Sequence, residues 1–475
     1  MRAWDAGLPR LWALNTSPRT LGLLGSSLVL VTVVSAAAAM LGTLAAFLVE
    51  RTDLPGRAVW RVLLVMPLAM PSFVAAYSWV STLRAQGLWW AVLILGVGTS
   101  PYVFLSVSAV LRRTSQNAED VARSLGLGPV AVFRRVTFPT LRPALTAGTL
   151  LVALYTLSDF GAVSLLRFDS FTRAIFMSYR ASFDRTEAAV LALLLMVVTL
   201  LITWAELRAR GRFTRAQAAA HRPATSRRLG RWRLPAVAFL GSVVGVGVLY
   251  PVVVVVGWII TGRSRSLDVV DLAQATWATL WLCFVAAVVI TVVSLPAGWL
   301  AARRDGPLIG AVQQTLYVTH ALPGLVVALS LVFLATRYLQ PIYHQPPLLI
   351  LGYLVLFAPL AVGAIRTAVA QAPPALEEVA ATLGHSPLRT FARVTLPLAA
   401  PGVVTAFLLV MLTAMKELPA TLLLRPTGTE TLATRLWLNT DELAYAAAAP
   451  YALALVLLAT VPTVILTIVQ RRATR

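Results

Sequence analysis

The 475-residue chain is 58% apolar and only 12% charged, with a mean hydropathy of +0.79. These values exclude an ordinary soluble globular protein, in which about a quarter of the residues are charged. Several apolar runs exceed the roughly 20 residues that a helix needs to cross a bilayer, so the composition predicts an all-α, polytopic membrane protein. The net charge of +21 would suggest nucleic acid in a soluble protein. Here nearly all the basic residues are arginines clustered between apolar runs, which indicates membrane topology, and we expect no nucleic-acid partner.

In chain order, eleven apolar runs are long enough to cross a membrane. They fall at about 21–48, 59–82, 88–111, 143–166, 187–206, 234–260, 274–301, 311–335, 348–370, 400–424 and 449–470. Residues 1–20 are mixed and lack a clean signal-peptide core. An Arg-rich linker at 207–233 separates the fifth run from the sixth. We expect this linker to be a cytoplasmic anchor of flexible length, and binding of anionic membrane lipid is the alternative.

The distribution of arginine predicts the topology. If the polar segments 112–142 and 371–399 face the cytoplasm, the cytoplasmic segments hold 26 arginines and the outer segments hold 13. This bias predicts a multi-pass membrane protein with its C-terminus in the cytoplasm. The N-terminal arginines then lie outside, which favours the expectation that a first span precedes the chain. The alternative is a first half of five spans with its N-terminus outside.

The polar segment 112–142 returns at 371–399. From Glu119 it reads Glu-Asp-Val-Ala-Arg-Ser-Leu-Gly, and from Glu377 it reads Glu-Glu-Val-Ala-Ala-Thr-Leu-Gly, at an offset of 258 residues. The match continues without a gap over 25 residues, which indicates an internal repeat. We therefore predict a first repeat at 1–206 and a second at 234–475, separated by the linker at 207–233.

The repeat extends beyond this segment. Asp159 and Glu417 also differ by 258, whereas Pro71 and Pro323 differ by 252. The second repeat therefore contains six extra residues, which we expect between Tyr338 and Pro347. The run at 234–260 has no counterpart before the first repeat, as in a six-plus-six protein that lacks its first span.

The sequence of each copy of the segment predicts two short helices joined by a turn. Glu119 and Asp120 lie in the first turn of the first helix, where the helix dipole favours carboxylates. Gly126 permits a left-handed C-terminal turn, and Pro129 opens the second helix. Pro139 is expected to stop that helix before the next apolar run. The alternative is an amphipathic connector on the membrane surface.

This repeated segment resembles the cytoplasmic Glu-Ala-Ala loop of the permeases of ABC importers, although the small pair is shifted and one position is acidic. In that family the first short helix docks in a cleft of the ATPase subunit. The resemblance implies that ten residues form ATPase-coupling loops: Glu119, Asp120, Ala122, Gly126, Pro139, Glu377, Glu378, Ala380, Gly384 and Pro397. It also implies a place in the prokaryotic inner membrane. As partners it implies two copies of an ATPase subunit and a periplasmic or lipid-anchored binding protein.

Charged residues inside apolar runs are candidates for a translocation path. These are Asp159, Lys416 and Glu417, and Tyr155 and His320 could face the same path. The alternative for the charges is a structural ion pair near a helix break, because Gly161 and Pro419 follow them. For His320 the alternative is a packed or interfacial side chain.

The segment from Lys416 to Pro426, in a chain that fuses two permease halves, resembles ferric-iron importer permeases. Permeases for thiamine, phosphonates or polyamines are similar and remain alternatives, and a secondary transporter is a more remote one. An intramembrane enzyme would need a catalytic constellation, and the sequence has only one cysteine, Cys283, and no metal-ligand cluster or phosphate-binding loop. We expect no catalytic residue, no metal site and no cofactor in this chain, with ATP and Mg²⁺ bound by the partner ATPase.

Overall fold

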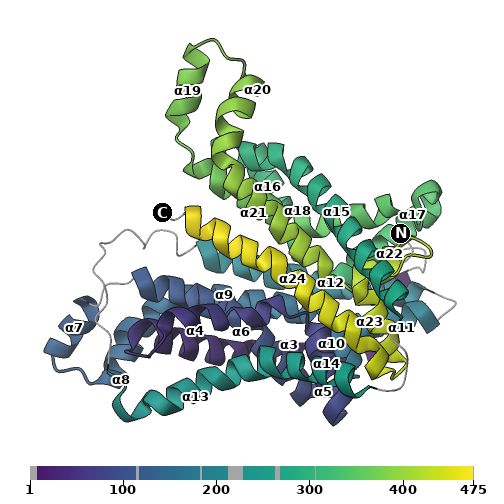
Figure 1. Ribbon diagram of the computed structural model, residues 1–475, viewed down its shortest axis with the longest axis horizontal. Coiled ribbons are helices and arrows are strands. Elements are labelled where there is room, and N and C mark those ends of the chain that lie inside the picture. The colour runs from purple at the N-terminus through teal and green to yellow at the C-terminus, as the bar shows by residue number, and fades with distance from the viewer. Residues whose placement is uncertain are drawn as a thin grey trace. The chain divides into compact units, whose positions relative to one another are not determined.

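A computed structural model describes residues 8–113, 117–181, 185–211, 228–262, 268–304 and 306–473. The chain forms two compact units, Met1–Ile260 and Thr261–Arg475, and each is described here by itself (Figure 1). All the regular secondary structure in the described residues is helical, which confirms the all-α prediction.

The first unit begins with long helices that pack side by side, and it ends with a helix that the sequence places outside the first repeat. Its elements are α2 (Leu8–Asn15), α3 (Pro18–Arg51), α4 (Arg57–Leu63), the 3₁₀ turn η1 (Met66–Ala69), α5 (Ser72–Leu83), α6 (Leu88–Arg113), α7 (Asn117–Ser124), α8 (Pro129–Val132), the π-helical η2 (Phe133–Thr137), α9 (Phe138–Ser158), α10 (Gly161–Leu165), α11 (Phe171–Ala181), α12 (Thr186–Gly211), the 3₁₀ turn η3 (Gly230–Trp232), α13 (Arg233–Val244), the π-helical η4 (Gly245–Leu249) and α14 (Tyr250–Thr261).

The second unit repeats this order. Its elements are α15 (Val269–Arg303), α16 (Pro307–His320), α17 (Gly324–Tyr338), the 3₁₀ turn η5 (Gln340–Ile342), α18 (Pro346–Gln371), α19 (Pro374–Thr382), α20 (Pro387–Thr390), the π-helical η6 (Phe391–Thr395), α21 (Leu396–Met415), α22 (Pro419–Leu424), α23 (Leu432–Asp441) and α24 (Tyr445–Ala473). The last residue of α3 and that of α15 differ by 252, and the first residue of α6 and that of α18 differ by 258. The six extra residues therefore lie at the end of α17 and in the loop before α18, as expected.

The apolar runs form the predicted spans, but four of them contain a break: 59–82, 143–166, 311–335 and 400–424. In the described residues, nine helices are long and apolar enough to cross a membrane. The predicted span 59–82 is a pair of segments bent by 83°, and 311–335 is divided between α16 and α17. At both places the run is therefore formed by two helical segments and not by one continuous helix. Pro71 and Pro323 are the N-cap residues of α5 and α17, and a proline is readily accepted at a helix start but not in its interior.

A second correction concerns Pro139 and its counterpart Pro397. Neither proline stops the short helix, because α8, η2 and α9 run on as a single helical span, Val130–Ser158, and Pro387–Met415 does the same in the second unit. At the junction the N–H of Phe138 donates to the carbonyl of Phe133, an i to i−5 bond that widens one turn. We attribute the continuity to this π-helical turn, which changes the local register where the proline ring would otherwise meet the preceding turn.

The helix pair α13–α14, which the sequence assigns to the second repeat, packs within the first unit. The ring of Tyr250 lies 4.0 Å from that of Trp79, centroid to centroid, and its hydroxyl is 2.6 Å from Thr82 Oγ1. The indole N–H of Trp258 donates to Ser81 at 3.0 Å. The limits of the compact units reflect contacts in the structure, whereas the limits of the repeats reflect similarity in sequence. The two need not coincide, so the repeat limits remain a prediction.

Candidate functional site: two coupling brackets

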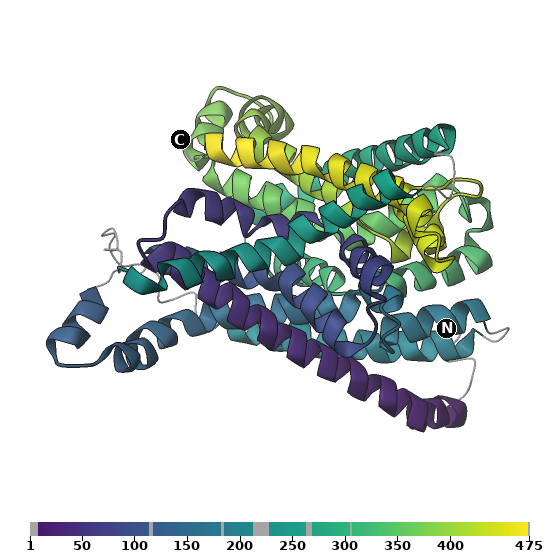
Figure 2. The ribbon, with the colours of Figure 1, turned by 60° about the horizontal axis from the view of Figure 1, so that its bottom comes forward.

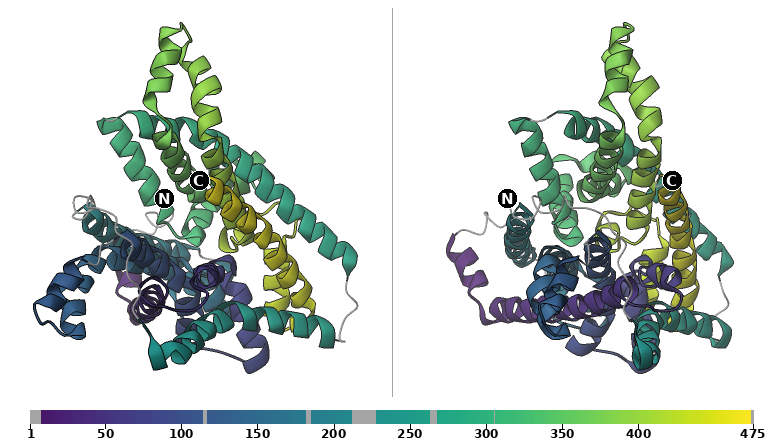
Figure 3. Two further views of the ribbon diagram at one scale, coloured as in Figure 1. Left: turned by 60° about the vertical axis from the view of Figure 1, so that its left-hand side comes forward. Right: turned by 90° about the vertical axis from the view of Figure 1, so that its left-hand side faces the viewer.

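Each unit carries a pair of short helices that extends beyond the membrane-spanning helices of its own unit. We call residues 117–137 the first bracket and residues 374–395 the second bracket. Figure 2 shows the first bracket beyond the ends of α3 and α6, and Figure 3 shows the second bracket standing clear of α15 and α18. Each bracket holds a short helix, a turn, a second short helix and a π-helical turn.

The turn in each bracket is set by a glycine. Gly126 has a φ of 84° and Gly384 has a φ of 80°, so both occupy the left-handed region that the sequence predicts. The N–H of Gly126 donates to the carbonyl of Arg123 at 2.9 Å, and that of Leu127 donates to Ala122 at 3.1 Å. The same two bonds close α19. This pattern satisfies the last carbonyls of the helix and turns the chain back sharply.

The two brackets expose apolar side chains. Leu125 is 77% exposed and Leu383, at the matching position, is 73% exposed. Val121, Val130, Val379 and Leu388 are also more than half exposed. Exposed apolar side chains that lie close together in the sequence are typical of a surface that contacts another protein or the membrane.

The two adjacent carboxylates of the first bracket differ in exposure, although Arg123 pairs with both of them. Glu119 is only 4% exposed, and its carboxylate accepts a hydrogen bond from Thr137 at 2.9 Å and lies 3.9 Å from Nη2 of Arg51. The side chain of Asp120 is 57% exposed and meets Arg123 at 3.0 Å on the same helix. The sequence does not distinguish the two carboxylates, whereas the structure buries the inward Glu119 and exposes the outward Asp120.

The second bracket repeats this division. Glu377 accepts from Thr395 at 2.8 Å and from Nε of Arg303 at 3.0 Å, whereas Glu378 is exposed. Arg303 also donates to the carbonyl of Ala372, at the end of α18. We call each set of arginine, inward glutamate and threonine a junction: Arg51, Glu119 and Thr137 in the first unit, and Arg303, Glu377 and Thr395 in the second.

Each junction ties three elements together. The arginine is the last residue of a spanning helix, the glutamate belongs to the short helix, and the threonine ends the π-helical turn before the next span. Ala122 and Ala380, three residues after each glutamate, are buried on the same face, where only a small side chain lets the short helix lie close. The arginines and threonines of the junctions were not predicted, although the two arginines differ by the repeat offset of 252 and the two threonines by that of 258.

The intramembrane carboxylates lie at breaks between helices. Asp159 follows α9 and accepts from the backbone N–H groups of Ala162 and Val163 at 3.0 and 3.3 Å. Glu417 follows α21 and accepts from the N–H of Ala420 at 3.1 Å. Each carboxylate therefore satisfies the first donors of the short helix that follows it. This finding supports a structural role for both, and it leaves their place in a translocation path as a prediction.

The two carboxylate side chains differ in length, and the residue that faces each one differs in size to match. We call this difference the size exchange. In the first unit the short Asp159 meets the hydroxyl of Ser72. In the second unit Gly324 stands at the position that matches Ser72, and a Cβ built there would overlap the carboxylate of Glu417. The longer glutamate thus fills the space that the serine side chain occupies in the first unit.

The other candidates for the translocation path are Lys416, Tyr155 and His320. Lys416 is the C-cap of α21, and its side chain is half-buried. Tyr155 is 37% exposed, with its ring 6.1 Å from that of Tyr102. His320 is the last residue of α16, and its side chain lies outside the part of the chain that the structure describes. Among the described residues, no group of three or more His, Cys, Asp or Glu could hold a metal ion.

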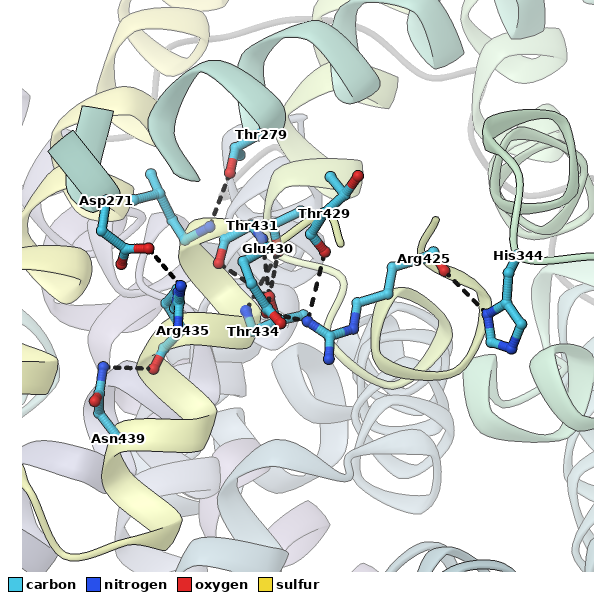
Figure 4. Close-up of polar contacts among 11 residues, drawn as sticks. Asp271, Thr279, His344, Arg425, Thr429, Glu430, Thr431, Thr434, Arg435 and Asn439 are labelled. Carbon is cyan, nitrogen blue, oxygen red and sulfur yellow. Dashed lines mark hydrogen bonds and ion pairs between the residues drawn. The ribbon is translucent and has the colours of Figure 1, made fainter. Parts of the chain in front are cut away.

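A polar network at the other end of α15 was not anticipated (Figure 4). Arg435 of α23 pairs with Asp271, which also accepts from the hydroxyl of Tyr451. Arg425 pairs with Glu430 in the loop before α23. One signal for this network was present in the sequence, since Arg425 and Arg167 differ by the repeat offset of 258. The pair of Arg435 with Asp271 joins residues 164 positions apart, and no local pattern indicates it.

The chain belongs to a family of membrane transport proteins. The model of the binding-protein-dependent transport system inner membrane component family matches residues 38–208 and again 294–475. Both matches contain one bracket. The chain is therefore a transmembrane permease subunit of a binding-protein-dependent ABC importer, and it resides in the inner membrane.

Individual relatives refine this picture. The chain is 36% identical over 473 residues to the Fe(3+)-transport system permease protein FbpB 2 of Haemophilus influenzae, covering 98% of this chain and 93% of that protein. It is 26% identical over 226 residues to the sulfate transport system permease protein CysT of Salmonella typhimurium, covering 43% of this chain and 81% of the relative. The molybdenum transport system permease protein ModB of Mycobacterium bovis is 31% identical over 223 residues, covering 41% of this chain and 81% of that protein.

Proposed function

We propose that this chain is the fused permease of an importer that moves Fe(III) across the inner membrane. The observation that carries this proposal is the full-length similarity to a ferric-iron permease, because the sulfate and molybdenum relatives match less than half of the chain. The segment from Lys416 to Pro426 adds support from the sequence. We propose that Fe(III) meets this chain only transiently and that selectivity lies mainly in a separate binding protein.

ATP would be hydrolysed by two copies of a partner ATPase, which also hold ATP and Mg²⁺. The support for two copies is the presence of two brackets with the same turn, the same inward glutamate and the same exposed leucine. In this proposal the exposed apolar side chains and the outward carboxylates Asp120 and Glu378 contact the ATPase. The brackets then lie in the cytoplasm together with the C-terminus, as the arginine distribution favours.

The translocation path is proposed to pass near the helix breaks at Asp159 and Glu417, with Tyr155, His320 and Lys416 as further candidates. Breaks of this kind place backbone polar groups at membrane depth, where they are tolerated only when buried in protein or lining a cavity. Thiamine, phosphonate or polyamine remains the alternative substrate. A secondary transporter is disfavoured because the family is binding-protein-dependent.

The test is uptake of radiolabelled Fe(III) by a strain that lacks this gene and is complemented with it. We expect uptake to require ATP and to resist competition by sulfate, molybdate, thiamine, phosphonate and polyamines. ATP-dependent uptake of one of these competitors instead of iron would overturn the substrate, and uptake without an ATPase would overturn the coupling proposal.

A further inference from the structure

Helices α3 and α15 are each tied to a neighbouring element near both ends. At the C-terminal end of each helix stands the arginine of a junction, Arg51 or Arg303. Twenty-four residues earlier stand Ser27 and Thr279, at the same spacing in both helices. The two arginines belong to the junctions of the brackets, whereas the two hydroxyl groups lie outside the junctions.

Both hydroxyls hold the first residue of a helix near the opposite end of the unit. Ser27 Oγ accepts from the N–H of Phe171, the first residue of α11, at 3.1 Å. Thr279 Oγ1 accepts from the N–H of Leu432, the first residue of α23, at 2.9 Å. Both bonds are buried. A buried backbone N–H that loses its partner is costly, so each bond fixes the start of the neighbouring helix to the spanning helix.

The two ties of each helix are far apart. At a rise of 1.5 Å per residue, twenty-four residues span about 36 Å, which exceeds the roughly 30 Å of a hydrocarbon core. One tie therefore lies at the bracket end of each helix, and the other lies toward the opposite end of the same helix. Between them α3 packs along α6 and α9, and α15 packs along α18 and α21.

We infer that α3 and α15 act as struts that carry movement of each bracket to α11 or α23 near the opposite end of the unit. Arg51 and Ser27 are the positioning residues of the first strut, and Arg303 and Thr279 are those of the second. The inference rests on the proposed coupling function of the brackets. Its physical basis is that a packed helix moves as a unit along its axis, so an element bound at one end follows an element bound at the other.

The transmission is tested in the complex of this chain with its ATPase and binding protein, reconstituted in proteoliposomes. Thr279→Val removes the tie of the second strut to α23 and keeps the shape of the side chain. We expect the ATPase to remain bound, while stimulation of hydrolysis by the loaded binding protein and uptake both fall roughly tenfold, within the usual range of coupling between sites. Thr279→Ser keeps the hydroxyl and should restore both.

Matched variants separate transmission from general damage. Thr32→Val in α3 is the control, because the Thr32 hydroxyl is exposed and bonds only within its own helix. Ser27→Ala repeats the test in the first unit, and Arg303→Met cuts the other end of the second strut. If Thr279 and Arg303 act through one helix, the double variant should be no worse than the more impaired single variant. The inference would be overturned if the losses of the two single variants multiplied in the double variant. Full uptake by both Thr279→Val and Ser27→Ala would also overturn it.

A distance measurement gives a readout that does not depend on uptake. Cys283 is the only cysteine and is buried, so Cys283→Ala provides a background for spin labels at the exposed positions of Leu383 and Leu443. We expect the distance between the labels to change with nucleotide in the parent complex, and this coupled change to be lost in Thr279→Val. An unchanged response in that variant contradicts the strut. A parent chain that never retains an ATPase contradicts the proposed function instead.

Discussion

At the scale of single residues, the glycines at 126 and 384 determine how each bracket turns. Both have a positive φ, and open space surrounds the position that a Cβ would take. The obstacle to substitution is therefore the backbone conformation itself, which costs a residue with a Cβ about 1 kcal/mol or more. A change at these positions alters the direction of the short helix without disturbing the spanning helices.

We expect Gly384→Asp, and equally Gly126→Asp, to leave membrane insertion intact and to weaken retention of the ATPase. Gly128→Ala is the control, because Gly128 lies in the same loop with open space and without a positive φ. The measurement is co-purification of the ATPase together with uptake. Full retention and full uptake in both aspartate variants would remove the main support for the coupling role of the brackets.

The size exchange at the helix breaks yields a second residue-scale prediction. Gly324→Ser should reduce the stability of the folded protein, because the new side chain overlaps Glu417, and overpacking of this kind typically costs about 1–3 kcal/mol. The double variant Gly324→Ser with Glu417→Asp recreates the pair of the first unit, Ser72 with Asp159, and should recover the loss.

Thermal stability in detergent, followed by size-exclusion chromatography, is the measurement for this pair. Glu417→Asp alone is the matched control, since it leaves a gap beside Gly324 and should also be less stable than the parent. Equal stability of Gly324→Ser and the parent would show that the glycine does not make room for the glutamate.

At the scale of elements, close helix packing depends on a few small residues. A Cβ at Gly42 of α3 would lie 2.6 Å from the carbonyl oxygen of Ser100 and 2.8 Å from the N–H nitrogen of Phe104, both in α6. The α3 and α6 backbones therefore approach more closely than a side chain permits, as is common between membrane helices.

Gly42→Val should separate these two helices and reduce the yield of folded protein. Gly25→Val in the same helix is the control, because nothing lies within 4 Å of its Cβ position. The intrinsic helix propensity changes equally in both variants, so a difference between them reports the packing alone. Similar yields would indicate that α3 and α6 can separate without loss.

The sequence predicted the elements well where one local rule decided the outcome. Gly126 and Gly384 took the left-handed turn, and the repeat offset anticipated the position of the extra residues before α18. It failed where a distant contact or a change of helix type decided. The π-helical turn carried the chain past Pro139, and the inward direction of Glu119 depended on Arg51, sixty-eight residues earlier in the chain. No local pattern distinguishes Glu119 from its neighbour Asp120.

At the scale of the whole molecule, the two halves are alike but not equal. In the first unit Glu50, which is 8% exposed, binds Arg61 at 2.7 Å and lies 3.7 Å from Arg112. The repeat offsets place Ala302, Gln313 and Ala370 at the corresponding positions of the second unit. A buried carboxylate needs partners, and the second unit has none of the three charged residues at these positions. Among the described residues, the ion pairs of Glu50 with Arg61 and Arg112 are therefore a feature of the first unit alone.

Topology is a prediction at this scale. A reporter fused after Arg475 and another inserted in the linker 207–233 should both report the cytoplasm, and a reporter in 425–448 should report the outside. The basis is the two-to-one bias of arginine between the two sides. Opposite locations for the linker and the C-terminus would show that the number of spans between them is wrong.

The packing of α13–α14 within the first unit has a consequence for a chain that is cut between its two halves. A break in the linker 207–233 would produce two polypeptides, of which the second still contributes the contacts of Tyr250 and Trp258 to the first. A break at 263–267 would leave those contacts inside the first polypeptide. Co-expressed fragments cut at the first place should therefore be held together by this helix pair and remain associated after solubilisation. The peptide bond between the two halves would then not be required for their association, because the contacts of α13–α14 with the first unit would hold them together.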